Sequence, residues 1–128
     1  MIEIKHRTSG QVLHRLDVDS LEGAVLSGLK LAGANLAGMN LTKANFRSTD
    51  LRQADLSKAT LHGATFYECS LAFATMDGVE CPGADFTEAT LEGTHAHNAN
   101  FSGSVFRYAR LPHCDFTGSK LTRCDMSV

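Results

Sequence analysis

The chain has 128 residues, of which 43% are hydrophobic and 20% are charged, and its formal net charge is −2. A chain of this length suits one domain, so we expect residues 1–128 to form a single unit. No apolar stretch approaches the length that crosses a bilayer, and a membrane partner is not expected. The near balance of acids and bases excludes a strongly charged surface over the whole protein.

The first elements in chain order are two short strands within residues 1–15. Ile2 and Ile4 alternate with polar residues, a Thr-Ser-Gly turn follows at residues 8–10, and Val12 opens a second apolar run. This pattern predicts a β-hairpin. The end of a stack of strands exposes unpaired backbone, so we expect the hairpin to cap whatever follows it.

Residues 16–128 are organised in units of five. We call every fifth residue from Leu16 the central residue of its unit; of 23 central residues, 21 are Leu, Phe or Met, and the exceptions are Cys81 and Ala96. A period of five matches neither the helical period of 3.6 nor the strand period of 2. Repetition over nearly the whole chain indicates a solenoid.

The other positions of the unit are also restricted. Two residues before the centre, 18 of 21 positions from 24 to 124 hold Ala, Ser, Thr or Cys. One residue before the centre, Asn and Asp recur, and two residues after it lie ten of the eleven glycines. Since Gly and Asn tolerate tight turns and positive φ, each unit is predicted to be a short extended piece followed by a corner.

Units such as ANLAG, ADLSK, ATLHG, ADFTE, ANFSG and CDFTG resemble the A-(D/N)-(L/F)-x-x unit of pentapeptide-repeat proteins. The resemblance implies an all-β fold, a right-handed quadrilateral β-helix with four units per coil, and here about five coils. It also implies that the central residue and the residue two before it point inward. Like residues recurring every 20 positions support four units per coil independently, as in the series Leu26, Phe46, Phe66, Phe86, Phe106 and Met126.

Two small central residues interrupt the column of large ones. Ala96 shares its coil with Phe101 and Phe106, and we interpret the pattern as compensation of volume at native packing density. The functional alternative is a pocket at Ala96.

The four cysteines fall on inward positions of the repeat. Cys81 is a central residue, and Cys69, Cys114 and Cys124 lie two before one. Free Cys behaves as a small hydrophobic residue in such places. Without a C-x-x-C pair or a secretory leader we expect reduced thiols in a cytoplasmic protein, with no disulfide and no zinc site among them.

One local sequence carries metal-binding chemistry. His95 and His97 flank the inward Ala96 and should point outward, with Asp115 and Asp77 one coil away from them. Two imidazoles and two carboxylates could bind Zn²⁺, Ni²⁺ or Cu²⁺. Surface His and Asp are common, however, so the prediction is that no metal or cofactor binds, with these four residues the candidate ligands otherwise.

Large outward side chains gather on two adjoining faces and form a candidate partner-docking surface. Phe73 is the only phenylalanine out of register and should face solvent. Arg and aromatic residues are typical interface anchors, although a mixed solvated surface remains the simpler interpretation. Acidic residues on the same faces argue against nucleic acid. The candidate residues are Arg47, Arg52, Tyr67, Phe73, Arg107, Tyr108 and Arg110.

The last repeats are still in register at the end of the sequence. Either their open edge pairs with another molecule, or the chain is part of something longer. We expect the first, pairing with a second copy, which predicts a homodimer interface at Phe116, Leu121 and Met126.

No nucleophile elbow, phosphate loop or H-E-x-x-H pattern is present, so an enzyme is not expected. The function favoured by the sequence is a non-enzymatic scaffold or protein-interaction module, in a bacterial protein whose protein partner is unknown. The resemblance offers one alternative, a DNA-mimicking protein that binds and protects gyrase. That role needs a strongly acidic rod, whereas here 14 acids face 12 bases.

Overall fold

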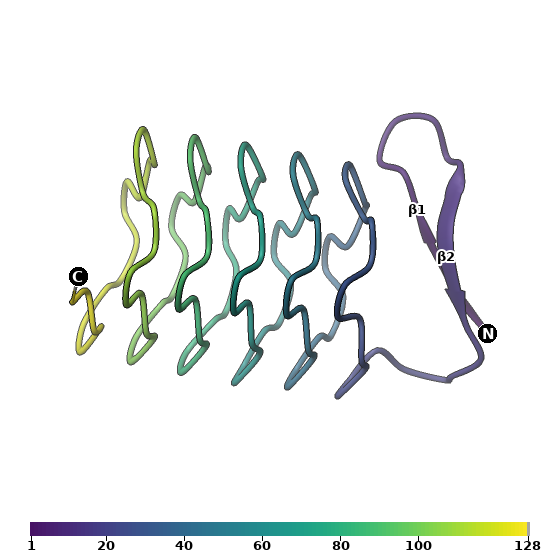
Figure 1. Ribbon diagram of the computed structural model, residues 1–128, viewed down its shortest axis with the longest axis horizontal. Helices are drawn as coiled ribbons and strands as arrows, with labels where there is room; N and C mark the ends of the chain where they lie inside the picture. The colour runs from purple at the N-terminus through teal and green to yellow at the C-terminus, as the bar shows by residue number, and fades with distance from the viewer. Residues whose placement is uncertain (128) are drawn as a thin grey trace.

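The computed structural model describes residues 1–127 and shows a stack of similar coils, with a hairpin at the N-terminal end and the C-terminus at the opposite end (Figure 1). Strands β1 (Ile2–Lys5) and β2 (Val12–Leu16) pair antiparallel and form the predicted hairpin. Residues 1–127 include no helix that could cross a membrane. The predicted repeat region extends to residue 128, which lies outside the described residues.

Successive coils are joined by parallel β-bridges between residues 20 positions apart, from Val25 with Asn45 to Val105 with Asp125. Four five-residue units therefore complete one coil. The amide of Leu26 donates to the carbonyl of Asn45 at 2.8 Å, and the amide of Asn45 donates back to the carbonyl of Ala24 at 2.9 Å. Each extended piece is thus bonded to the coils before and after it, which satisfies backbone groups that the narrow interior would otherwise leave unpaired.

The central residues fill the interior. Those from Leu21 to Phe106 are at most 4% exposed. Four phenylalanines stack in one column, with centroid separations of 5.1, 4.8 and 4.8 Å between successive rings of Phe46, Phe66, Phe86 and Phe106. This confirms the predicted recurrence at 20. Burial declines in the last coil, where Met126 is 44% exposed.

Aromatic rings surround the position where the central residue is small. Ala96 is fully buried, and Phe116 occupies the same column one coil later. Phe116 packs edge-on against Phe101 at 5.5 Å and against Phe106 at 6.3 Å between ring centroids. These contacts support the interpretation that neighbouring aromatic volume offsets the small Ala96 side chain.

The backbone conformation at the corners is more uniform than the distribution of glycines suggests. At all 21 positions from 23 to 123 that lie two residues after a centre, φ is positive, whether the residue is one of the ten glycines or one of eleven others. Lys43, Phe73 and Arg123 are examples, with φ of 58°, 60° and 59°. The coil imposes the left-handed conformation, and side chains that disfavour it adopt it nonetheless.

The recurring Asn and Asp residues have a different role from the one predicted. None has positive φ; each side chain instead accepts a hydrogen bond from the amide two residues on, as Asn45 does from Arg47 at 2.9 Å. This is the Asx turn. The same bond is made by Asn35, Asn40, Asn45, Asp50, Asp55, Asp85, Asn100, Asp115 and Asp125.

Candidate functional site

Two histidines and two aspartates from three successive coils meet on one side of the solenoid. Nδ1 of His95 lies 2.7 Å from Oδ1 of Asp77, and Nε2 of His97 lies 2.5 Å from Oδ2 of Asp115. The two imidazole centroids are 3.7 Å apart. We call these four residues the His-Asp cluster. The sequence identified all four, but it placed His95 with Asp115 and His97 with Asp77, whereas the shortest side-chain contacts run along the diagonals.

Asp77 replaces a missing turn residue. His95 stands where Asn or Asp makes the Asx turn in other units, so the amide of His97 has no acceptor two residues before it. Oδ1 of Asp77, one coil earlier, accepts that amide at 2.8 Å and also contacts Nδ1 of His95. One carboxylate oxygen therefore fixes both the backbone of His97 and the imidazole of His95.

Asp115 divides its two oxygens between the turn and the histidines. Its Oδ1 accepts the amide of Thr117 at 3.0 Å and the hydroxyl of Thr117 at 2.5 Å. Its Oδ2 faces Nε2 of His97 and lies 3.9 Å from Nε2 of His95. The Thr117 hydroxyl first, and His97 second, hold the pKa of the Asp115 carboxyl well below its usual range.

Most arginines of the candidate partner-docking surface already have an acidic partner. Arg52 makes two bonds to Asp50, at 2.9 and 2.8 Å. Arg107 lies 2.7 Å from Asp125. Such pairing neutralises the positive charge that an anionic polymer would need.

A further arginine of the same surface is paired in two ways. The guanidinium of Arg47 lies 5.0 Å from the centre of the Tyr67 ring and 4.0 Å from a carboxylate oxygen of Glu68. Tyr67 in turn is influenced by its acidic neighbours, since Glu88 first and Glu68 second raise the pKa of its phenol. Tyr108 is 57% exposed, and Arg110 is also exposed.

Phe73 is the most exposed aromatic ring of this surface, at 60%. Its ring covers the backbone of Gly93, where a Cβ atom would lie only 2.5 Å from two ring carbons. A side chain at position 93 would therefore displace the ring from this place. The prediction that Phe73 faces solvent is confirmed.

Hollows open on two sides of Phe73. One of about 470 Å³ is lined by the hairpin turn from His6 to Thr8 together with Gln53 and Phe73. The other, of about 310 Å³, is lined by Phe73 with Ala32, Arg52, Gln53 and Ala72. Arg7 reaches across the first hollow and donates to the carbonyl of Gln53 at 3.2 Å.

Sequence reasoning missed Arg7 and Gln53 as neighbours of Phe73. The hairpin is not part of the repeat, so no periodicity places Arg7 beside a coil. The five-residue register does place Gln53 20 positions before Phe73, and that spacing was the available signal.

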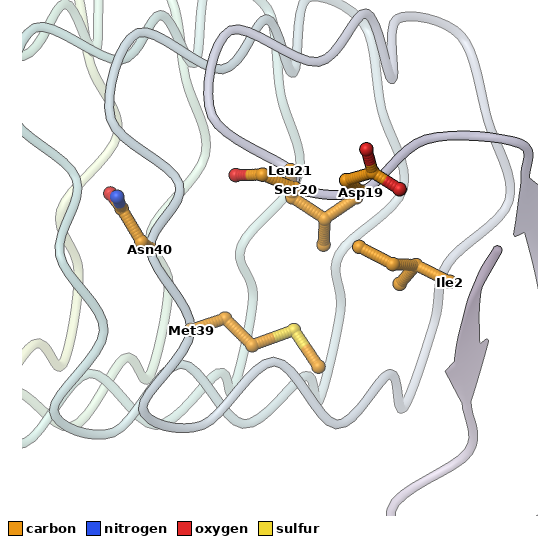
Figure 2. Close-up of a pocket in the computed structure, with 6 residues that line it drawn as sticks. All are labelled: Ile2, Asp19, Ser20, Leu21, Met39 and Asn40. Atoms are coloured by element: carbon orange, nitrogen blue, oxygen red, sulfur yellow. The ribbon is translucent and has the colours of Figure 1, made fainter.

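A third hollow, of about 330 Å³, lies between the hairpin and the first coil. Figure 2 shows the side chains of Ile2, Leu21 and Met39 pointing toward this space, while Asp19 and Asn40 lie at its margin. Its lining combines the apolar side chains of Ile2, Leu21 and Met39 with the polar residues Asp19, Ser20 and Asn40.

The cysteines lie inward as predicted, and all four are free thiols. Burial raises the pKa of Cys69 and of Cys81, which are 1% and 0% exposed. Cys114 and Cys124 are half-buried, and Sγ of Cys114 lies 2.7 Å from the carbonyl of Leu91. Thiols in this state are poor nucleophiles and poor metal ligands.

The comparisons with known proteins agree with this architecture. The family model for pentapeptide repeats matches in eight copies, over residues 20–57, 44–80, 54–93 and 84–123. No curated protein sequence matched the chain.

Solved structures with a similar fold include a pentapeptide-repeat protein from the thylakoid lumen of Arabidopsis thaliana, with 31% identity, a TM-score of 0.60, and coverage of 75% of this chain and 63% of that one. Another is Rfr23 of the cyanobacterium Cyanothece 51142, with 28% identity, a TM-score of 0.52, and coverage of 68% and 63%. The chain thus spans less than two thirds of either protein's length.

A third is QnrB1, a plasmid-mediated fluoroquinolone resistance protein, at 20% identity and a TM-score of 0.47, over 82% of this chain and 56% of that one. This last likeness is too remote to carry an argument about function. Members of the family adopt a right-handed quadrilateral β-helix and are generally structural or interaction proteins rather than enzymes. The family model covers most of the chain, and the protein described here therefore belongs to the pentapeptide-repeat family.

Proposed function

We propose that this protein is a non-enzymatic scaffold that docks a protein partner at the Phe73 surface, which we define as Arg7, Ala32, Gln53, Ala72 and Phe73. The observation that carries the proposal is the side chain of Phe73, which is 60% exposed, lies against Gly93 of the next coil and lines two hollows. An exposed aromatic beside an arginine is the composition typical of interface hot spots.

The chemistry of this surface indicates what kind of partner fits. The hollows flanking Phe73 accept apolar side chains, and the alanines in their lining leave room for them. The Arg7 guanidinium donates to the neutral carbonyl of Gln53 and, among the described residues, has no carboxylate within ion-pair distance. A carboxylate of the docked protein could therefore form an ion pair with Arg7. We therefore propose a protein segment that presents an acidic residue next to an apolar one.

Affinity capture from the native cell tests this proposal when it compares three baits. These are the unmodified chain, Phe73→Gln, and Val25→Gln as the control, because Val25 is another apolar residue, 69% exposed, outside the Phe73 surface. We expect a specific protein, identified by mass spectrometry, to be retained by the first and third baits and lost from the second. Equal retention by all three baits would contradict docking at Phe73.

We also propose that the hairpin caps the first of about five coils. The amide of Arg7 donates to the carbonyl of Gly33 and the amide of Asn35 donates to that of Lys5, both at 2.8 Å, and Ile4 is fully buried. These bonds support a capping role, since they pair backbone groups at the end of the stack. Ile4→Asp should lower the melting temperature strongly, as measured by circular dichroism; an unchanged value would exclude a cap.

At the other end we propose that two copies of the 128-residue chain pair through the coil containing Phe116, Leu121 and Met126. In earlier coils the amide of a central residue donates to a carbonyl of the next coil, as the amide of Leu91 does to the carbonyl of Arg110. Within residues 1–127 the amide of the central residue Leu111 has no acceptor. The carbonyls of Ala109, Cys114 and Ser119 likewise have no backbone donor within residues 1–127, whereas the equivalent carbonyls of Ala99 and Ser104 accept the amides of Lys120 and Asp125. An edge with both kinds of group is self-complementary, as a two-fold dimer requires.

Sedimentation equilibrium tests the dimer. The unmodified chain and the Val25→Glu control should sediment as dimers, whereas Leu121→Glu with Met126→Glu should give monomers. A monomeric unmodified chain, or a dimer indifferent to both changes, would refute the interface.

The DNA-mimicking alternative finds no specific support, because the net charge is −2 and the arginines of the docking faces are exposed. Cytoplasmic localisation stays a prediction.

A further inference from the structure

We propose that the His-Asp cluster, formed by Asp77, His95, His97 and Asp115, is a binding site for a divalent cation of borderline softness, with Zn²⁺ the best match. Ligand atoms of Asp77, His95 and His97 lie within 4.8 Å of one another, and Asp115 contacts both histidines. Two imidazoles with carboxylates are a common donor set for this ion. The site is independent of the Phe73 surface and of the docking role proposed for it.

The hydrogen bonds of Asp77 prepare His95 to bind a metal. A carboxylate accepts but does not donate, so the 2.7 Å contact with Asp77 places the proton of His95 on Nδ1 and leaves a lone pair on Nε2. This arrangement, in which a carboxylate fixes the tautomer and orientation of a metal-binding histidine, is the usual outer shell of zinc sites. Asp77 is therefore assigned as a positioning residue.

The inner ligands are then Nε2 of His95, Nε2 of His97 and Oδ2 of Asp115. Oδ2 lies 3.9 Å from the first nitrogen and 2.5 Å from the second. Tetrahedral zinc with bonds of about 2.0–2.1 Å separates its ligand atoms by roughly 3.3 Å. One observed distance is longer than this value and the other is shorter, so these side chains must rotate to admit the ion.

The backbone holds these ligands in place before any ion arrives. Oδ1 of Asp115 is committed to the Thr117 turn, which leaves Oδ2 directed at the histidines. The amide of His97 is bonded to Asp77, and the amide of His95 donates to the carbonyl of Ala74 at 3.0 Å. Preorganisation of this kind reduces the entropy lost on binding.

The cluster is also accessible to solvent. The exposed fractions of the side chains are 45% for His95, 34% for His97 and 46% for Asp115. An adjoining hollow of about 520 Å³, lined in part by Asp77 and His97, leaves space for water as a fourth ligand. Lys58 also lines this hollow, and its positive charge opposes the binding of a cation.

The test is isothermal titration of Zn²⁺ into the full chain prepared without a histidine tag. We expect one ion per chain and micromolar or tighter affinity. Nε2 of His97 can bind the ion once the single proton of the neutral imidazole lies on Nδ1. Co²⁺ in place of Zn²⁺ should give the visible absorption of a tetrahedral site.

Variants separate the assigned roles. His97→Ala and Asp115→Asn should abolish tight binding, and Asp77→Asn should weaken it by about 10–100-fold, as loss of an outer-shell partner typically does. His62→Ala is the matched control, since His62 is an exposed histidine elsewhere on the repeats and should leave affinity unchanged. Circular dichroism confirms that each variant is folded. Zinc affinity in the millimolar range, or equal affinity in His97→Ala and His62→Ala, would overturn the proposal.

Discussion

Phe66 and Phe86 stack face to face, with ring centroids 4.8 Å apart and an angle of 2° between the rings. The same spacing separates adjacent β-strands, so the side-chain column repeats at the distance set by the backbone ladder. Each central side chain therefore touches its equivalents one coil before and one coil after. A change of volume at one centre is transmitted to its two neighbours, and little beyond them.

Ala96→Leu tests the packing of this interior. Because Phe101, Phe106 and Phe116 pack against one another beside the fully buried Ala96, added methyl groups should overpack the column and destabilise the fold by about 1–3 kcal/mol. Urea unfolding measures the change. Met76→Leu, at the same position one coil earlier, conserves volume and serves as the control. A more stable Ala96→Leu protein would instead reveal an unfilled void.

The thiols should differ in reactivity according to their depth. Burial raises the pKa of Cys69 and Cys81 most strongly, while Cys114 and Cys124 are only half-buried. Labelling of the native protein with a thiol reagent, followed by mass spectrometry, should modify Cys124 and Cys114 first. Rapid labelling of Cys69 or Cys81 without denaturant is the result that would contradict their inward placement.

The Asx turns should each contribute measurably to stability. Asn45→Ala removes the acceptor for the amide of Arg47, and the loss of that bond should cost about 0.5–1.5 kcal/mol. Asn45→Asp retains an acceptor at the same place and should be nearly neutral. Thermal unfolding compares the stability of the two variants. Equal destabilisation would show that the side-chain nitrogen of Asn45, rather than its side-chain oxygen, contributes the stability.

Asp125 should titrate at unusually low pH. The amide of Ser127 first, and Arg107 second, lower the pKa of its carboxyl from 3.8 to about 2. Since the folded pKa lies below the unfolded one, the stabilisation from this group is present above pH 4 and is lost as pH falls through about 2.

Carboxyl chemical shifts in an NMR titration measure this pKa directly. In Arg107→Gln the value should rise but stay below 3.8, because the Ser127 amide still donates to the carboxylate. A value unchanged by the substitution would mean that Arg107 and Asp125 do not pair in solution.

The sequence was sufficient for the fold because one inward residue in every five is large and apolar. That period defines the register, and the recurrence of Phe46, Phe66 and Phe86 defines how many units close a coil. Interior packing is thus encoded in a pattern that repeats often enough to be unmistakable.

The candidate sites were only partly predictable, because an outward side chain can contact different neighbours in different rotamers. The register brings Asp77, His95, His97 and Asp115 to adjacent positions, but rotamers decide that His95 pairs with Asp77. The replacement of an Asx turn by Asp77 depends on an amide one coil away. Such contacts follow from geometry that a one-dimensional period does not contain.

The corner conformation provides a test in which one chemical change has opposite effects at two places. Ser48 lies two residues after a centre and has φ of 55°, whereas Ser57 lies one residue after a centre and is not among the positive-φ residues. Ser48→Gly relieves strain of about 1–2 kcal/mol, less the entropy that Gly adds to the unfolded chain, so the melting temperature should rise. Ser57→Gly relieves no strain but adds the same entropy to the unfolded chain, so it should lower the melting temperature.

The hydroxyls of Ser48 and Ser57 lack a hydrogen-bond partner within residues 1–127, so the comparison isolates the effect on the backbone. Calorimetry on the two variants decides the matter, and a decrease in both would show that the coil holds Ser48 in its left-handed conformation without strain.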